Sequence, residues 1–236
     1  MANFYGRYDP RNFPTYPIFE AARYLLIPEV TLRSWVLGRS YQARGSKHFS
    51  EPLIKLPNSP DAKIRQLSFT NLVEAHVLRV IRSDHRISLD KVRTALDYVE
   101  NHYDLPHPLA RMEFQTDGVD LFVESIGRLI NASQAGQLAM HKTLENLLKR
   151  IELDESGVAS KLFPFTRLNE EDDPQRVVID PKISFGRPVL VGTGIPTAIL
   201  AERYKAGESI DDLADDYGCA RLQIEEAIRC EFPLTA

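Results

Sequence analysis

The chain has 236 residues, enough for two compact domains or for one domain with small added modules. Its hydrophobic share of 43%, its charged share of 26% and its net charge of −4 are ordinary for a soluble globular protein. No run of about 18 apolar residues occurs, and the N-terminus lacks the apolar stretch of a secretory signal. We therefore expect neither a membrane span nor secretion.

Charge is distributed unevenly along the chain. Residues 1–82 hold 12 Lys/Arg against 6 Asp/Glu, a net of +6, whereas residues 83–176 have a net of −6 and residues 177–236 a net of −4. A basic N-terminal part suggests contact with an anionic polymer, although on charge alone an ordinary solvated face is the better interpretation. The two cysteines, Cys219 and Cys230, are too few for a disulfide framework or a metal site. They predict small core thiols in a reducing cytoplasm.

The N-terminal part predicts a helix-turn-helix. Apolar residues recur at helical spacing over Ile18–Leu25, and Pro28 prevents that helix from continuing. A second helix is expected from Glu29 to Val36 or Leu37, with Gly38 placed to end it. Two short helices joined by a tight turn form the motif that places its second helix in the DNA major groove.

Side chains on the second helix divide into two sets. Val30 and Leu32 are expected to face inward, and Trp35 is expected in the core, with its indole N–H open as a phosphate donor. Polar and basic side chains here and in the next segment suit phosphate oxygens and base edges. The candidate DNA contacts are Thr31, Arg33, Ser34, Arg39, Tyr41, Arg44, Lys47, His48, Lys63 and Arg65.

A wing and two further helices are predicted next. Leu53–Leu56 and Ile64–Leu67 are strand-like runs around a Pro57–Asp61 turn, and Lys63 and Arg65 are placed to follow a DNA backbone. Ser68 or Thr70 caps a helix through Ile81, and Ser88 caps another. The second of these helices has an apolar stripe of Leu89, Val92, Leu96, Val99 and Tyr103.

The order of these elements, with Thr31-Leu32-Arg33-Ser34-Trp35 on the second helix, resembles the winged helix of the MerR regulators over roughly residues 16–103. The resemblance implies binding to double-stranded DNA. MerR proteins usually continue into a coiled coil and an effector site, and this sequence departs from them there.

The central segment predicts a hairpin followed by a helix. Leu109–Glu124 alternates in polarity around Thr116-Asp117-Gly118, and a helical pattern runs from about Ser133 to Leu153. Leu138, Leu144, Leu147, Leu148 and Ile151 share one face of that helix, which is more typical of a core or a dimer seam than of a cofactor pocket. His102 and His107 flank Asp104, but their place beside two prolines disfavours a metal site.

The C-terminal segment carries the most specific pattern. Val178-Ile179-Asp180-Pro181, then Gly186-Arg187-Pro188 and Gly192-Thr193-Gly194-Ile195-Pro196, precede predicted helices near 197–206, 210–217 and 220–229. Ser209 and Asp212 predict a capping-box pair, and Gly218 a helix end. This layout resembles a domain of unknown function that recurs in VapB-type antitoxins of toxin–antitoxin pairs. Gly194 stands where that family has Arg.

The C-terminal helices are acidic, since Asp211, Asp212, Asp215 and Asp216 lie on one of them. Phosphate repulsion disfavours DNA binding there. A dimerisation or partner-binding role is expected instead, with Arg187, Arg203, Arg221 and Arg229 as candidate partner contacts.

The expected fold is mainly α with small β elements, in three parts: a DNA-binding domain at residues 1–105, a hairpin and helical region with an acidic linker at 106–174, and a C-terminal helix-turn-helix-like domain at 175–236. The acidic central part has two possible roles, which are dimerisation and covering a basic cleft of the toxin.

The antitoxin resemblance implies repression of its own operon and neutralisation of a PIN-type ribonuclease, an enzyme that holds divalent metal with clustered carboxylates. A homodimer, or a larger assembly with toxin, is expected. A stand-alone MerR-like regulator with a small-molecule pocket in the middle block is the alternative. An enzyme is disfavoured because no phosphate loop, Cys/His metal spacing or nucleophile motif occurs, so no catalytic residue, metal or cofactor is expected.

Overall fold

The computed structural model describes residues 9–43, 45–57, 65–82, 87–104, 106–167 and 174–232. Within these ranges the protein is mainly helical, with short antiparallel strand pairs, as the sequence predicts. The helices are α1 (Ile18–Tyr24), α2 (Glu29–Leu37), α3 (Phe69–Val77), α4 (Leu89–Tyr103), α5 (Val119–Ile130), α6 (Gln134–Leu148), α7 (Thr197–Lys205), α8 (Ile210–Tyr217) and α9 (Arg221–Glu231). The paired strands are β1 (Tyr16–Pro17) with β4 (Gln66–Leu67), β2 (Arg39–Ala43) with β3 (Ser46–Ser50), β5 (Ile151–Leu153) with β6 (Ala159–Leu162), and β7 (Val177–Val178) with β8 (Val189–Leu190).

Helices α1 and α2 form the predicted helix-turn-helix. Pro17 and Pro28 stand at their N-caps with φ of −54°, which prolines hold without strain. Gly38 ends α2 with φ of +72°, a left-handed value that favours glycine. The prediction for these two helices is confirmed.

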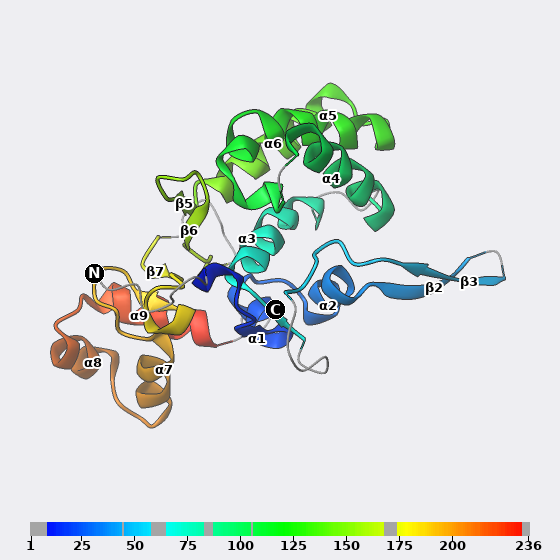
Figure 1. Ribbon diagram of the computed structural model, residues 1–236. Coiled ribbons are helices and arrows are strands. Elements are labelled where there is room, and N and C mark those ends of the chain that lie inside the picture. Colours follow the sequence, from blue (N-terminus) through cyan, green and yellow to red (C-terminus); the bar gives the residue numbers. More distant parts are fainter. Residues whose placement is uncertain are drawn as a thin grey trace.

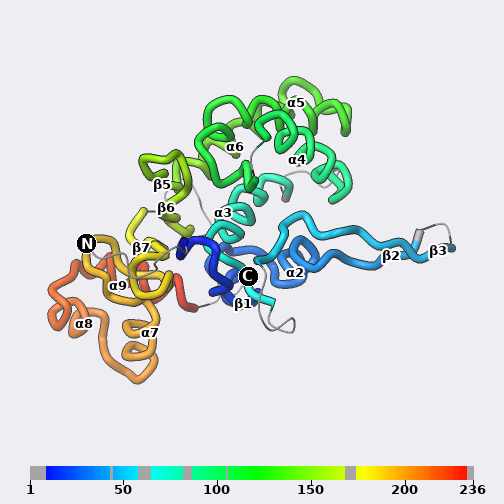
Figure 2. The backbone as a smooth tube through the Cα atoms, in the orientation of Figure 1, coloured from blue at the N-terminus to red at the C-terminus, as the bar shows by residue number. Residues whose placement is uncertain are grey.

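The β2–β3 hairpin follows α2 directly and extends away from the rest of the molecule (Figure 1; Figure 2). After β3 the chain returns to α2, where the backbone N–H groups of Leu53 and Ile54 donate to the Trp35 carbonyl oxygen at 2.7 and 3.0 Å. These two bonds fix the base of the hairpin against the end of α2.

The predicted wing was therefore misplaced. Residues 53–56 form no strand, and the amides of Leu53 and Ile54 bond to α2. Gln66 and Leu67 do form a strand, but it pairs with β1. The intervening turn and Lys63 lie largely outside the described residues. Ser68 caps α3 with a reciprocal bond to Asn71, as predicted, and a short 3-10 segment, Leu78–Arg82, follows.

The predicted hairpin at Leu109–Glu124 is wrong, because this stretch is helical. A 3-10 turn at Pro108–Ala110 leads into one π-helical turn at Phe114–Gly118, which continues as α5. Gly118 has a right-handed helical φ of −67°, so the Thr-Asp-Gly signal makes no reversal. Val119, Phe122, Val123 and Ile126 are buried at the spacing of one helix face.

The following helix is shorter than predicted. α6 ends at Leu148, and Ile151–Leu153 instead forms β5, one strand of the hairpin that the central region does contain. Leu144, Leu147 and Leu148 are buried as predicted, but Leu138 is exposed.

The C-terminal helices follow the predicted order. Ser209 accepts from the Asp212 backbone N–H at 3.1 Å, its hydroxyl contacts the Asp212 carboxylate at 2.6 Å, and Gly218 ends α8 in the left-handed region. α9 packs between α7, α8 and α1.

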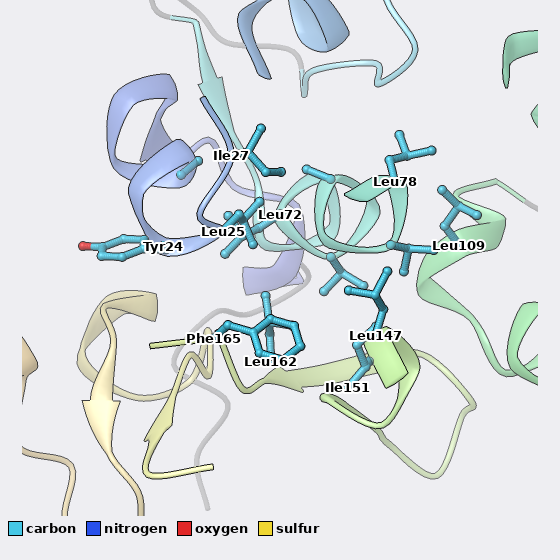
Figure 3. Close-up of a cluster of buried hydrophobic side chains, with 14 of the residues drawn as sticks. Tyr24, Leu25, Ile27, Leu72, Leu78, Leu109, Leu147, Ile151, Leu162 and Phe165 are labelled. Atoms are coloured by element: carbon cyan, nitrogen blue, oxygen red, sulfur yellow. The ribbon is translucent and has the colours of Figure 1, made fainter. Parts of the chain in front are cut away.

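One continuous set of buried apolar side chains runs from Tyr16 to Cys230. Figure 3 shows the α3 ribbon, with Leu72, between Leu25 and Ile27 on one side and Leu147, Leu162 and Phe165 on the other. Polar contacts join the chain's two ends as well, since Arg23 on α1 pairs with Glu231 at the end of α9 at 2.8 Å. The N-terminal and C-terminal segments thus share a core.

Candidate nucleic-acid interface

The outward face of α2 is less polar than predicted. Val30 is 81% exposed, so its predicted inward position is wrong, whereas Leu32 is fully buried. The Arg33 guanidinium is exposed and pairs with Glu29 one turn earlier at 2.6 Å. The Ser34 hydroxyl donates to the Thr31 carbonyl oxygen at 2.7 Å, and both side chains are half-buried. Arg33 is consequently the α2 candidate most available to a ligand.

Trp35 has only 1% of its surface exposed. Its ring is part of the core, as expected. The indole N–H cannot reach a phosphate from that position, so Trp35 is not a phosphate donor.

The hairpin register separates its side chains into two faces. Arg39 lies opposite Ser50 and Tyr41 opposite His48, while Gln42 lies opposite Lys47. Because successive side chains of a strand point to opposite faces, Arg39, Tyr41 and His48 share one face and Lys47 lies on the other. The Tyr41 and His48 rings stack with their centroids 5.6 Å apart.

The cations of this hairpin are available. Arg39 and Lys47 are exposed, and neither has a carboxylate partner within the described ranges. Arg65 is exposed just before β4, whereas Arg44 and Lys63 lie outside the described residues. An exposed arm with uncompensated cations, set directly beside α2, is suited to a polyanion.

Phe49 was missed by the sequence analysis. Its ring is 54% exposed and lies on the Lys47 face of the hairpin, opposite Ser40. Placing Phe49 required the register of the hairpin, and the prediction had put the strands elsewhere.

His102, Asp104 and His107 do not converge. The described part of the chain holds no group of three or more His, Cys, Asp or Glu residues that could bind a metal. His107 Nδ1 instead lies 2.9 Å from Glu74 Oε1, and this hydrogen bond raises the pKa of His107.

Three of the four candidate partner-binding arginines are neutralised internally. Arg203 pairs with Glu208 and Asp216, Arg221 with Asp211 and Glu225, and Arg229 with Glu225 and Glu226. Arg187 is exposed and has no such partner among the described residues. α9 is the second helix of the predicted C-terminal helix-turn-helix, α8–α9. It buries Ile224, Glu226, Ala227, Ile228 and Cys230, and little of its surface is left for contact with a partner.

Two family profiles match the chain. Residues 14–96 match the family described as "Putative DNA-binding HTH domain", and residues 177–229 match "Protein of unknown function (DUF433)". The first covers α1, α2 and the hairpin, so the segment predicted as a helix-turn-helix is similar to domains described in that way.

Curated relatives extend this likeness over most of the chain. "Putative antitoxin VapB45" of Mycobacterium tuberculosis (strain ATCC 25618 / H37Rv) is 29% identical over 228 residues, which cover 91% of this chain and 92% of the relative. "Uncharacterized protein Rv2308" of the same strain is 26% identical over 228 residues, 90% of this chain and 88% of the relative. The likeness to a relative named as a putative antitoxin thus extends along nearly the whole chain.

A solved structure shares the fold. The crystal structure of Rv2018 from Mycobacterium tuberculosis superimposes with a TM-score of 0.67 at 24% identity, covering 94% of this chain and 99% of that one. In the described part of the chain, no helix combines the length and the apolar character that crossing a membrane requires.

Proposed function

We propose that this protein is a VapB-type antitoxin that represses its own operon and neutralises a cognate PIN-type ribonuclease. The observation that carries the DNA-binding half is the exposed hairpin, whose unpaired Arg39 and Lys47 stand beside α2. The likeness to a relative named as an antitoxin supports the toxin-binding half.

DNA binding combines two elements. α2 enters the major groove, and the hairpin follows the phosphate backbone as the wing of a MerR-like winged helix. Arg33 reads a base after leaving Glu29, which costs little because an exposed ion pair is worth about 0–1 kcal/mol. As a homodimer, the protein covers two half-sites about one helical turn or a multiple apart.

The parts of the chain divide these tasks. Residues 1–105 bind DNA, and residues 175–236 serve pairing and partner contact. The toxin contributes the metal and the catalytic carboxylates, and the antitoxin blocks access to them.

Salt dependence tests the hairpin. The double variant Arg39→Ala/Lys47→Ala should weaken binding to the DNA upstream of the gene and lower the slope of log Kd against log salt by about 2, since each phosphate contact contributes about 0.9. The matched control, Lys182→Ala/Lys205→Ala, removes two exposed lysines of the C-terminal segment and should leave the slope unchanged. Equal slopes for both variants would contradict the hairpin assignment.

Co-expression tests the antitoxin assignment. The chain should restore growth to cells that produce the protein encoded by the adjacent open reading frame. Growth arrest that persists despite equal expression of the chain would refute neutralisation.

A stand-alone regulator is the second candidate, and one cavity favours it. About 370 Å³ lies between α3, α4 and the segment after the hairpin, within the usual range for a small-molecule site. Glu74, Glu100 and His107 line it together with several leucines. An adjacent gene encoding a short protein rich in clustered carboxylates favours the antitoxin, and its absence favours this alternative.

A further inference from the structure

Phe185 combines high exposure with an unfavourable backbone. Its side chain is 83% exposed, and both Ser184 and Phe185 have left-handed φ values, 49° and 56°. A β-carbon resists this conformation, so bulky residues there are uncommon. Exposing an aromatic ring to water adds a further cost. Such strain in a native structure points to a function.

Neighbouring residues hold this turn in place. The Gly186 N–H donates to the Ile183 carbonyl oxygen at 2.9 Å, and the Arg187 N–H donates to the Ser184 carbonyl oxygen at 3.2 Å. The buried Tyr16 hydroxyl donates to the Gly186 carbonyl oxygen at 2.8 Å from the N-terminal part of the chain. The strained turn is therefore imposed by packing.

The Phe185 ring stands between two hollows in the surface. One, of about 330 Å³, is also lined by Phe13 and Pro181. The other, of about 500 Å³, is also lined by Arg187 and Pro188, and by the carboxylates Glu20, Glu202 and Glu231. An apolar side chain between two depressions, beside an exposed cation, offers both shape and charge to a partner.

Charge indicates what kind of partner fits. Arg203, Arg221 and Arg229 are each paired with carboxylates of their own chain, whereas Arg187 has no carboxylate partner in the described ranges. A partner that presents carboxylates is favourable.

The location also suits a second partner. Figure 1 and Figure 2 show the hairpin and the α7–α9 region on opposite sides of the molecule. The described residues that line the two hollows beside Phe185 include none of the hairpin, so a protein bound there leaves the hairpin free to contact DNA.

We propose that Phe185 and Arg187 form the docking surface for the toxin, whose surface provides an apolar socket for the ring and a carboxylate for the guanidinium. This proposal rests on the antitoxin function proposed above. Phe185 supplies the central apolar contact, and the strained turn presents it already in position, which lowers the entropy lost on binding.

Calorimetry with the full-length chain and the purified product of the adjacent open reading frame tests this surface. Phe185→Ala should raise Kd by about thirty-fold or more, as for an aromatic residue at the centre of an interface. Arg187→Glu should also weaken it. The matched control is Tyr98→Ala, because Tyr98 is an aromatic that is 50% exposed on α4, away from the proposed surface, and Kd should not change.

Phe185→Gly separates function from folding. Glycine accepts the left-handed backbone, so this variant should raise Tm by about 2–4 °C while losing affinity for the toxin. A purely structural Phe185 would instead lower Tm on substitution.

The outcomes are distinct. Normal binding by Phe185→Ala overturns this docking surface and leaves the antitoxin function intact. Absence of binding by the unaltered chain overturns both. If only Tyr98→Ala lowers the affinity for the toxin, the toxin binds the central helices and the proposal is overturned. If Phe185→Ala dissociates a dimer of this chain, the surface is a contact between copies, and the proposal is overturned as well.

Discussion

At the scale of single residues, Glu226 shows how the C-terminal helix is tied to the rest of the chain. Its side chain is fully buried, and it accepts from the Arg167 Nε at 2.9 Å and from the Thr166 hydroxyl. Arg229 on the same helix pairs with it at 2.5 Å. A buried carboxylate is tolerated because several donors compensate for its lost hydration.

The acid stability of the protein should depend on Glu226. Burial raises the pKa of this carboxyl, but hydrogen bonds from Arg167 and Thr166 and the charge of Arg229 outweigh burial, so the net pKa is lowered. A lowered folded-state pKa stabilises the protein above the ordinary Glu value near 4.5, and this contribution is lost as pH falls through the folded-state value. Glu226→Gln should cost about 1–3 kcal/mol at pH 7 and flatten the loss of stability below pH ~4.5.

Urea unfolding at several pH values measures this effect. Glu155→Gln, at an exposed position, is the control and should keep the pH profile of the unaltered chain. A Glu226→Gln profile parallel to that of the unaltered chain would show that the buried pair makes no pH-dependent contribution.

At the scale of elements, the junction of α2 and β2 sets the direction of the hairpin. A β-carbon on Gly38 would lie 2.4 Å from the Ser50 carbonyl oxygen and 2.7 Å from the Phe49 ring, in addition to the strain of a left-handed φ. The close approach of β3 to the end of α2 therefore requires glycine.

A pair of glycines separates these two costs. Gly45 also has a left-handed φ, +80°, but nothing lies within 4 Å of its would-be β-carbon. Gly45→Ala should cost about 1–2 kcal/mol, whereas Gly38→Ala should cost about 2–5 kcal/mol because collision adds to strain. Chemical denaturation measures both. Equal losses would mean that the contact with β3 relaxes at no cost.

The sequence predicted elements well where the chemistry is local. Proline at helix starts, glycine at helix ends and the Ser68 and Ser209 caps act within a few residues, so α1, α2, α3, α7 and α8 could be placed. Thr116-Asp117-Gly118 predicted a turn, but tertiary packing keeps Gly118 helical, and Val119, Phe122, Val123 and Ile126 are buried on one face of α5.

The hairpin could not be located in this way. Among the strand side chains that the structure describes only Ser50 is buried, so the hairpin lacks the apolar alternation by which strands are recognised. Lys47 and His48 were singled out by charge, but their opposite faces depend on a register that composition does not contain. The left-handed backbone of Phe185 is likewise invisible in the sequence, since phenylalanine rarely adopts it.

At the scale of the whole molecule, the shared core predicts that distant parts unfold together. Trp35, the single tryptophan, lies in the N-terminal part, and Ile224 is fully buried on α9. Buried apolar side chains connect the two. A cavity made at Ile224 should therefore lower the stability of the part around Trp35 as well, and the unfolding transition followed by Trp35 fluorescence should shift.

Ile224→Ala should lower the free energy of unfolding by about 2–5 kcal/mol. The transitions followed by Trp35 fluorescence and by far-ultraviolet circular dichroism should shift together, as expected for one cooperative unit. Leu138→Ala, at a 72% exposed position, should shift neither. A fluorescence midpoint that stays constant while the dichroism midpoint falls would identify two independently folding parts.

The hydrogen bond from Tyr16 to the Gly186 carbonyl oxygen has a consequence for how this chain can recombine. The match to the C-terminal family spans only residues 177–229, whereas the hydroxyl that bonds to its strained turn comes from 170 residues earlier. A gene fusion that moves the C-terminal segment alone leaves that carbonyl unbonded. The shortest transferable unit is thus longer than the segment by which the family is recognised, and it includes the strand that carries Tyr16.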